Sequence, residues 1–491
     1  MPELDKSLYV AGLQCPRRLW LAAHEPERAD PRTPSVEQRL ARGRELGREA
    51  RRLFPGGVEV VGSGAAALAR TRELLADPSI PALFEAAFEH AGIRVRVDVL
   101  ERLHGGAYGL REVKSSTSVK EIDLDDAVLQ LHVLRGAGLR VPSVEIVHVN
   151  GGYRRGTGPV EWERFFVRRD VTSDAEFLLV DVPVRAAGFA EALRGEAPEI
   201  EPSPHCRRPH VCEFWGDCTR AKPATWIGYL PGLQATTFHA LRAAGLERAD
   251  EIPASFSLTA TERRARSAHR GNGRCVAASL PGALTRAGPP AHYLDFECAT
   301  PAVPLFAGTA PYLPIAFQWS LHSQPADAAP LTHCEFLADA DGDPRRAFAE
   351  SLLAALGRDG WPVVVYSGFE GQVLAELAAS LPDLAGDLGA LARRLFDLLP
   401  IVRSGVYDVG FAGSFSIKRV APALVPGFGY GDLTDVADGG RAAELLEQLG
   451  RGAVDPGRAA ALRASLLAYC ARDTLALVTV HRALRELASA V

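Results

Sequence analysis

Three cysteines recur at every sixth position in the stretch HCRRPHVCEFWGDC, which spans residues 205–218. These are Cys206, Cys212 and Cys218. A metal site made of thiolates usually takes four ligands, so three cysteines in one loop require a fourth ligand from another part of the chain. If the loop binds metal, the fold must bring a distant segment to it.

The number of cysteines favours metal binding over a disulfide scaffold. Eight cysteines in 491 residues are too few for a disulfide-rich protein, and a local group of them in a reducing compartment is typical of a metal site. The opening residues MPELDKSLYV lack the pattern of a signal peptide, and no run reaches the ~18 apolar residues of a membrane helix. We therefore expect a soluble, cytoplasmic protein with two or three domains.

Basic residues are unevenly distributed, although a net charge of −5 excludes an overall polycation. Residues 38–52 and 261–274 are rich in arginine, which indicates either solvated helix faces or a surface that follows phosphates. Of the 55 basic residues only five are lysines, so each lysine needs its own explanation. They are Lys6, Lys114, Lys120, Lys222 and Lys418.

The chain falls into three regions. Residues 1–222 mix helical and strand-like patterns and end at the cysteine loop. Residues 223–290 are rich in Pro, Gly and Arg and form a connecting region, in which Leu230–Leu246 is expected to hold two short helices. The stretch resembles a helix-hairpin-helix DNA-backbone module, but Gln234 stands where that module has a second glycine, so a packed linker is favoured. Over residues 291–491 strands alternate with helices, which predicts an α/β domain. The fold class expected for the whole chain is α/β.

Two carboxylates and a lysine form the first candidate centre. Asp98 lies on one expected strand, and Glu112 and Lys114 lie two residues apart on the next. Alternation along a strand places Glu112 and Lys114 on one face, and a hairpin can bring Asp98 beside them. Two carboxylates can hold a hard cation such as Mg²⁺, and the lysine can offset charge on a scissile phosphate. On these residues alone, a solvated strand edge is the favoured alternative.

The pattern Asp-(x13)-Glu-x-Lys, followed by a helix with Gln130, resembles the RecB-type PD-(D/E)XK nucleases. Within that group the chain is most similar to the CRISPR-associated adaptation nucleases that carry an iron–sulfur cluster. Those proteins have one cysteine in a Cys-Pro-Arg context near the N-terminus, and the resemblance implies that Cys15, in SLYVAGLQCPRRLWL, is the fourth ligand. It also implies a PD-(D/E)XK fold whose catalytic residues are Asp98, Glu112, Lys114 and Gln130.

The cofactor implied by this resemblance is a [4Fe–4S] cluster, because four thiolates with long, irregular spacing fit a cluster. Tetrahedral Zn²⁺ is the alternative, although the paired Cys-x2-Cys units common at zinc sites are absent from the sequence. Two departures from the family pattern leave any additional metal ligand open. Leu134 stands where the family has tyrosine, and a glutamate would have to replace the usual histidine. The candidates are Glu45, Glu49 and Glu85.

A second group of acidic residues lies in the C-terminal region. Asp295 and Glu297 stand two apart on the expected strand YLDFE and so point the same way. Tyr469 and Asp473 stand four apart on an expected helix, one turn along one face. Between them, Glu370 follows an apolar strand at the start of a helix. Such carboxylates can hold the two cations of a phosphodiester-cleaving centre.

The order of these motifs resembles the DEDD exonucleases of the RNase H-like fold, in the branch with tyrosine before the last aspartate. The resemblance implies hydrolysis of the 3′-terminal phosphodiester, with two Mg²⁺ or Mn²⁺ ions on the four carboxylates and the tyrosine orienting the attacking water. Glu370 departs from the family, which has aspartate in this motif. Asp397, Asp408 and Lys418 are expected to be structural, with Lys418 the best candidate for a phosphate contact.

We therefore expect a metal-dependent nuclease with two centres, whose partner is nucleic acid, DNA before RNA. The tandem also resembles a family of uncharacterised bacterial proteins with this two-nuclease layout. The alternatives are a nucleic-acid-binding scaffold with one or both centres inactive, or a redox-responsive regulator built on the cysteines. Cys298 and Cys470 flank the second centre and are expected to pack, because a thiolate is too soft a ligand for Mg²⁺.

Overall fold

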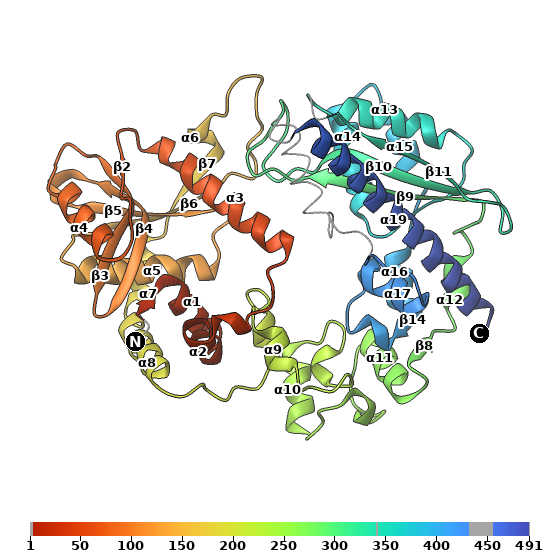
Figure 1. The fold of residues 1–491 in the computed structure, drawn as a ribbon, viewed down its shortest axis with the longest axis horizontal. Coiled ribbons are helices and arrows are strands. Elements are labelled where there is room, and N and C mark those ends of the chain that lie inside the picture. The colour runs from red at the N-terminus through yellow and green to blue at the C-terminus, as the bar shows by residue number, and fades with distance from the viewer. Residues whose placement is uncertain (1–2, 340–341, 432–454, 491) are drawn as a thin grey trace. The chain divides into compact units, whose positions relative to one another are not determined.

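The computed structural model describes residues 3–339, 342–431 and 455–490. By its internal contacts the chain divides into two compact units. Unit 1 consists of residues 1–221 and 301–313, and unit 2 of residues 222–300 and 314–491. Each unit combines helices with a mixed β-sheet (Figure 1), so the chain has the α/β class expected from the sequence.

Unit 1 is built on a seven-stranded sheet in the order β2-β3-β4-β5-β6-β7, with β1 paired to β4. Its strands are β1 (Leu4–Asp5), β2 (Val58–Glu59), β3 (Ala82–His90), β4 (Ile93–Arg102), β5 (Tyr108–Lys114), β6 (Ser143–Val149) and β7 (Phe166–Asp170). Strands β3, β4 and β5 are antiparallel neighbours, whereas β5 and β6 are parallel. Because a parallel pair needs a crossover connection, the chain passes through helix α5 between β5 and β6.

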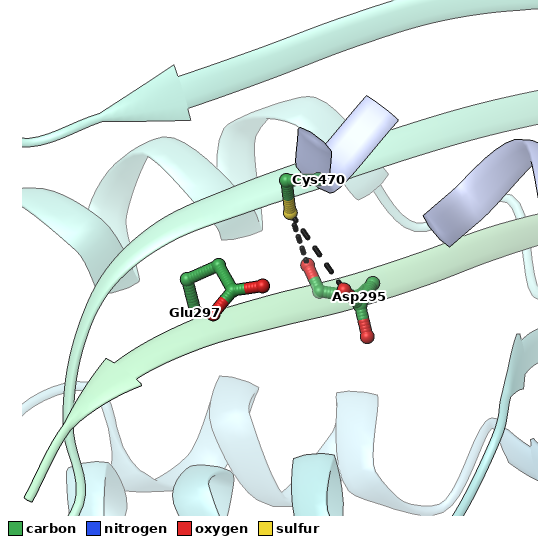
Figure 2. Close-up of side chains that lie close together, drawn as sticks. All are labelled: Asp295, Glu297 and Cys470. Atoms are coloured by element: carbon green, nitrogen blue, oxygen red, sulfur yellow. Dashed lines mark hydrogen bonds between the residues drawn. The ribbon is translucent and has the colours of Figure 1, made fainter. Parts of the chain in front are cut away.

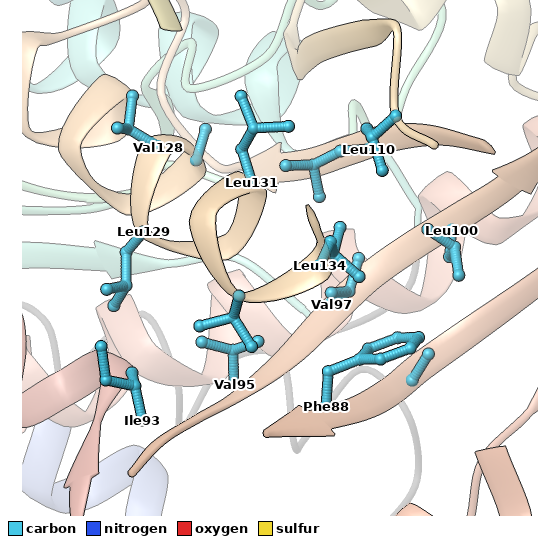
Figure 3. Packing of buried hydrophobic residues seen from close by; sticks show 14 of the residues in the cluster. Phe88, Ile93, Val95, Val97, Leu100, Leu110, Val128, Leu129, Leu131 and Leu134 are labelled. Carbon is cyan, nitrogen blue, oxygen red and sulfur yellow. The ribbon is translucent and has the colours of Figure 1, made fainter. Parts of the chain in front are cut away.

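Helix α5 covers the strands that carry the first candidate centre. The helices of unit 1 are α1 (Lys6–Gln14), α2 (Pro16–His24), α3 (Pro34–Ala50), α4 (Gly64–Leu75), α5 (Glu121–Gly136), α6 (Trp162–Phe165), α7 (Thr172–Leu179), α8 (Val182–Arg194) and α9 (Trp215–Thr219). Leu129 and Leu134 of α5 and Val95 and Val97 of β4 belong to one buried apolar cluster (Figure 3). Each buried leucine contributes about 1.5–3 kcal/mol, so the cluster fixes α5 against the sheet.

Unit 2 is built on a five-stranded mixed sheet in the order β11-β10-β9-β12-β13. Its strands are β9 (Ala291–Ala299), β10 (Ile315–Gln324), β11 (Thr332–Leu337), β12 (Val363–Val365) and β13 (Leu395–Asp397). Strand β10 is antiparallel to both β9 and β11, whereas β12 runs parallel to β9 and β13. A separate antiparallel pair joins β8 (Arg274–Val276) to β14 (Val406–Asp408). The near-continuous burial of β9 and β10 fits a sheet covered on both faces.

The long helix α19 lies across β9 and β10 in unit 2 (Figure 1). The helices of this unit are α10 (Ala235–Ala243), α11 (Ala260–Arg270), α12 (Leu280–Leu284), α13 (Arg345–Leu356), α14 (Phe369–Ser380), α15 (Ala385–Ala392), α16 (Leu398–Gly405), α17 (Ile417–Leu424) and α19 (Pro456–Ser489). Among the described residues, none of the helices is long and apolar enough to cross a membrane.

The connecting region differs from the expectation of two short helices in Leu230–Leu246. Within that range the structure has one helix, α10, and the chain before it makes only a short 3₁₀ turn at Ile227–Tyr229. Pro231 and Gly232 explain the difference, because Gly232 adopts a left-handed φ of +69° that interrupts a helix. The prediction of a first helix was therefore wrong.

Arginines of α11 anchor the connecting region through backbone carbonyls. Arg266 donates to the carbonyl of Pro253 at 2.9 Å, and Arg270 donates to that of Asp250 at 2.6 Å. Arg264 donates to the carbonyl of Arg403. These contacts give three arginines of the helix a structural role that neither interpretation of residues 261–274 described.

Candidate metal centres and the cysteine site

The structure brings together all four residues expected at the first centre. Asp98 lies on β4, Glu112 and Lys114 lie on β5, and Gln130 lies on α5. One oxygen of Asp98 accepts the backbone N–H of Val113 at 2.8 Å. The side-chain amide of Gln130 donates to Glu112 Oε2 at 2.6 Å. The antiparallel β4–β5 pair and the packed helix thus place the carboxylates and the amide in one group.

Two further residues of this centre were missed in the sequence, Lys6 and Asp126. Lys6 Nζ lies 2.8 Å from Glu112 Oε1 and 3.2 Å from Asp126 Oδ2. Lys114 Nζ lies 2.7 Å from the same Glu112 oxygen and also contacts Asp126. Signals for both existed, since Lys6 is one of only five lysines and Asp126 precedes Gln130 by one helical turn.

Burial and the two ammonium groups set the charge states of this centre. Burial raises the pKa of Asp98 to about 7 and that of Asp126 to about 6, and repulsion from Glu112 adds to both shifts. Burial also opposes ionisation of Glu112, but Lys114, Lys6 and the hydrogen bond from Gln130 outweigh it and lower the pKa of Glu112. The centre therefore keeps Glu112 ionised, whereas Asp98 and Asp126 take up protons near neutral pH.

Two buried side-chain oxygens of the first centre are available to bind a cation in addition to the two ammonium groups. Asp126 Oδ1 and Gln130 Oε1 are buried without a hydrogen-bond partner within the described parts of the chain. Two of the three glutamates considered as replacement ligands pair with arginines: Glu49 lies 2.6 Å from Arg52, and Glu85 lies 3.4 Å from Arg96. Asp126, which contacts both lysines, is the third carboxylate of the group.

The second centre gathers its carboxylates from three elements of unit 2. Asp295 and Glu297 lie on β9, Glu370 lies at the start of α14, and Asp473 lies on α19. Asp473, Glu297 and Glu370 are all close enough to Asp295 to disfavour its ionisation. Except for Asp295, which is partly exposed, these side chains are buried. Four acidic groups in one buried place repel each other, and a cation would remove the repulsion.

The pKa values of the second centre reflect this crowding. Burial and, to a smaller extent, repulsion from Asp473 and Glu297 raise the pKa of Asp295 well above its usual value. Burial and Asp397 raise the pKa of Glu370 to about 8, and burial raises that of Asp473. Glu370 Oε2 and Asp473 Oδ1 are also buried without a hydrogen-bond partner among the described residues. Unpartnered buried oxygens fit a site that is completed by a cation.

Cys470 belongs to this centre, although the sequence predicted that it would only pack. Its sulfur lies 3.8 Å from the backbone oxygen and from Oδ2 of Asp295 (Figure 2). One donor atom from each of Asp295, Glu297 and Cys470 lies within 4.8 Å of the others, an arrangement with the spacing of a metal site. Burial has the largest effect on the pKa of the Cys470 thiol, and repulsion from Asp295 the next largest; both raise it.

Tyr469 is held by Lys418 beside the carboxylates. Lys418 Nζ donates to the Tyr469 hydroxyl and lies 4.7 Å from the centre of its ring. Burial, Asp473 and Glu297 raise the pKa of Tyr469, so its hydroxyl stays protonated at neutral pH. Tyr430, which the sequence did not indicate, lies near Asp473 and 5.8 Å from Lys418. Lys418, the best candidate for a phosphate contact, thus lies at the second centre.

Asp397 and Asp408 act as helix caps, as the structural expectation for them predicted. Asp397 Oδ1 accepts the backbone N–H of Leu399 at 2.9 Å at the start of α16. Asp408 accepts from Gly410 N at 2.8 Å and pairs with Arg274 at 2.7 Å. Both side chains are therefore engaged in local structure.

The four expected cysteine ligands line one cavity in unit 1. These are Cys15, Cys206, Cys212 and Cys218. Cys15 lies between α1 and α2, Cys206 lies in a 3₁₀ turn at Pro204–Arg207, Cys212 precedes α9 and Cys218 lies in it. Burial raises the pKa of the Cys212 thiol to about 12 and also raises the pKa of Cys206 and of Cys218. Free thiols of these three cysteines would stay protonated at neutral pH, so a bound metal would have to displace their protons.

Sequence comparison adds one match. Residues 292–416 match a family described as a domain of unknown function, DUF2779. The match begins on β9, beside Asp295 and Glu297, and includes Glu370, but it ends before Tyr469 and Asp473. A search of curated proteins finds no match to the chain.

Proposed function

We propose that this protein is a metal-dependent nuclease with two centres. Unit 1 would be a PD-(D/E)XK-type domain, and unit 2 an RNase H-like 3′–5′ exonuclease of the DEDD type. The observation that carries the proposal is the second centre, where four carboxylates from three elements crowd together with unpartnered oxygens. Such crowding is costly unless cations offset the charge, and paired cations are the means by which many nucleases cleave phosphodiesters.

In the second centre, Asp295, Glu297, Glu370 and Asp473 would hold the cations. Bound cations would supply an activated water and stabilisation of the leaving oxygen. Tyr469 would orient the attacking water through its neutral hydroxyl, and Lys418 fixes the position of that hydroxyl. The longer side chain of Glu370, compared with the aspartate of the family, fits this role because its Oε2 lacks a partner among the described residues.

In the first centre, Asp98, Glu112 and Asp126 would hold a cation, which would supply charge stabilisation at the scissile phosphate. Glu112 Oε1 now accepts both lysines, so a cation at this oxygen would release one ammonium group. Lys114 would then turn to the phosphate and offset its growing negative charge. Lys6 would keep Glu112 oriented.

The cysteine cavity of unit 1 would hold a [4Fe–4S] cluster. Four cysteines line it, which is the ligand set of such a cluster, and tetrahedral Zn²⁺ is the alternative. The backbone N–H of Phe214 donates to the Cys212 sulfur at 3.4 Å, which would stabilise a thiolate there. DNA is the proposed substrate, by the resemblance of unit 1, and RNA is the alternative that the assay must include.

The test is an assay with purified protein and end-labelled single- and double-stranded DNA and RNA, with Mg²⁺, Mn²⁺ or EDTA. Asp295→Ala should abolish stepwise shortening from the 3′ end, and Lys114→Ala should remove a different set of products. Glu376→Gln on α14 and Glu89→Gln on β3 are matched controls that remove carboxylates away from the centres. Absence of metal-dependent cleavage on every substrate would refute the proposal and favour a binding scaffold.

A further inference from the structure

One segment of the chain connects two strands of unit 2 but belongs to unit 1 by its contacts. Residues 301–313, which we name the strap, follow β9 and precede β10. Strand β9 carries Asp295 and Glu297, so the strap begins four residues after the last carboxylate of that strand. The chain therefore passes between the two units at three places, after residues 221, 300 and 313.

Apolar side chains of the strap complete a core of unit 1. Ala302 is 2% exposed and belongs to the same buried cluster as Leu46 of α3, Val149 of β6 and Phe165. Val303 and Tyr312 pack against this cluster. Without the strap, these apolar surfaces of α3 and β6 would be exposed to water, which is unfavourable.

Arg155 anchors the strap by hydrogen bonds in both directions. Its guanidinium donates to the carbonyls of Pro304 and Leu305, at 2.9 and 2.7 Å. Its backbone N–H donates to the carbonyl of Thr309 at 3.0 Å, and its carbonyl accepts the N–H of Gly308 at 2.8 Å. The strap also closes on itself, since Tyr312 N donates to the carbonyl of Pro301. Its position is therefore defined by polar contacts as well as by packing.

Tyr312 connects the strap to the first centre. Its hydroxyl donates to the carbonyl of Ser115, the residue that follows Lys114 at the end of β5. Tyr312 has a φ of +61°, a left-handed conformation that is strained for a bulky side chain. Strain of this kind persists where surrounding contacts hold it, and here it aims the ring at the peptide beside Lys114.

We propose that Tyr312 is a positioning residue for Lys114, so that the first centre depends on a segment supplied from the second half of the chain. The inference rests on the proposed nuclease function of the first centre. The hydroxyl of Tyr312 fixes the Ser115 carbonyl, which restrains the end of β5 and hence the direction of the Lys114 side chain. A lysine held in its productive direction loses less freedom when it meets a phosphate.

The test compares Tyr312→Phe with Tyr108→Phe in the full chain. Tyr108 lies at the other end of β5, and its hydroxyl accepts a hydrogen bond from Arg102 at 3.0 Å, so the control also removes one hydroxyl contact from this strand. Hydrogen exchange followed by mass spectrometry reads the backbone of residues 110–118 whether or not the protein cleaves DNA. Cleavage is measured in an Asp473→Ala background, which silences the second centre without altering β9.

Tyr312→Phe should speed exchange in residues 113–118 by about fivefold or more, and Tyr108→Phe should not. It should lower kcat of the first centre on the order of tenfold, with KM little changed. Unchanged exchange in residues 113–118 would overturn the positioning role, and so would an equal increase over all of unit 1. If no variant cleaves any substrate, the nuclease proposal fails, and the exchange result still decides whether Tyr312 positions the end of β5.

Discussion

Lys6 and Cys15 lie at opposite ends of helix α1: Lys6 is its first residue, and Cys15 immediately follows its last. The helix has nine residues, about 13 Å at 1.5 Å per residue. Its first end contacts Glu112 and its last end reaches the cysteine cavity. A rigid element of this length links the cysteine site to the first centre, so a disturbance at one end is expected to affect the other.

Replacing Cys15 by serine should therefore affect both the cavity and the centre. We expect purified Cys15→Ser protein to lose the broad absorbance near ~400 nm expected of a thiolate-bound cluster. Unit 1 should melt several degrees lower, because the metal no longer joins its two ends. Absorbance spectra and differential scanning calorimetry measure the two effects. Cys334→Ser, at an exposed cysteine on β11, is the control. A wild-type spectrum in Cys15→Ser would contradict the ligand assignment.

Replacing Lys6 by methionine should weaken metal-free unit 1. The variant keeps the length of the side chain but leaves Glu112 with one ammonium group fewer in a buried setting. We expect a loss of about 1–3 kcal/mol in the free energy of unfolding, measured with urea in EDTA. Arg70→Met is the matched control, because it removes a surface ion pair with Glu73, which contributes little. Equal stability of the two variants would argue against a structural role for Lys6.

Stability without metal should fall as the pH rises from about 6.5 to 8.5. Burial raises the pKa of Glu370 to about 8 and of Asp98 to about 7, so the folded protein binds more protons here than the unfolded chain does. The stability that such groups contribute is present below their unfolded pKa and lost as pH rises through the folded pKa. Melting temperatures in EDTA should show this fall. Mg²⁺ should remove it by replacing the protons.

The variant Glu370→Gln tests whether ionisation of Glu370 causes the expected fall in stability with rising pH. The variant cannot ionise, so its melting temperature in EDTA should depend less on pH between about 6.5 and 8.5 than that of the wild type. Glu376→Gln on the same helix should keep the wild-type dependence. A melting temperature that rises with pH in the wild type would show that the carboxylates ionise freely in the folded state.

On the acidic side, His481 should contribute a loss of stability from about pH 6.5 down to about pH 4, against the gain that the buried carboxyl groups give. Burial lowers the pKa of His481 to about 4, so the unfolded chain binds a proton there before the folded protein does. His481 Nδ1 lies 2.9 Å from the hydroxyl of Tyr293, which fixes the neutral ring. His481→Gln should therefore lose less stability over this range than wild type, measured by urea unfolding. His239→Gln, at an exposed histidine, should behave as wild type.

Tyr469→Phe should slow the second centre without releasing its metal. The hydroxyl orients water in the proposed function, and its loss should lower 3′ shortening about 10–100-fold. Calorimetric titration with Mn²⁺ should give an affinity close to that of the wild type, because the carboxylates remain. Tyr407→Phe, which loses a hydroxyl contact with Gly413 N at 3.2 Å, is the control. A large loss of Mn²⁺ affinity in Tyr469→Phe would place the tyrosine in the metal site itself.

The sequence predicted the parts of the centres that lie on regular elements. The pairs Glu112–Lys114 and Asp295–Glu297 follow from alternation along a strand, which depends on neighbours in sequence. Asp126 was missed because α5 is buried on nearly all sides, so its polar residues show no separate face. One-turn spacing from Gln130 could have indicated it.

Other contacts depend on pairings that no local pattern contains. Lys6 meets Glu112 across 106 residues, and Lys418 meets Tyr469 across 51. The rarity of lysine in the chain marked both residues but did not say what they contact. The placement of Tyr312 in unit 1 could not be inferred, because the strap reads as an ordinary connection between two strands.

The strap has a consequence for how the protein is made. Unit 1 ends its continuous part at residue 221, but its last core segment is complete only when residue 313 has been added. At about 5–20 residues per second, the first unit waits on the order of five to twenty seconds with an apolar surface uncovered. During synthesis the nascent chain therefore exposes an apolar surface that a chaperone could bind. Codon choice between residues 222 and 313 would set how long that surface stays exposed.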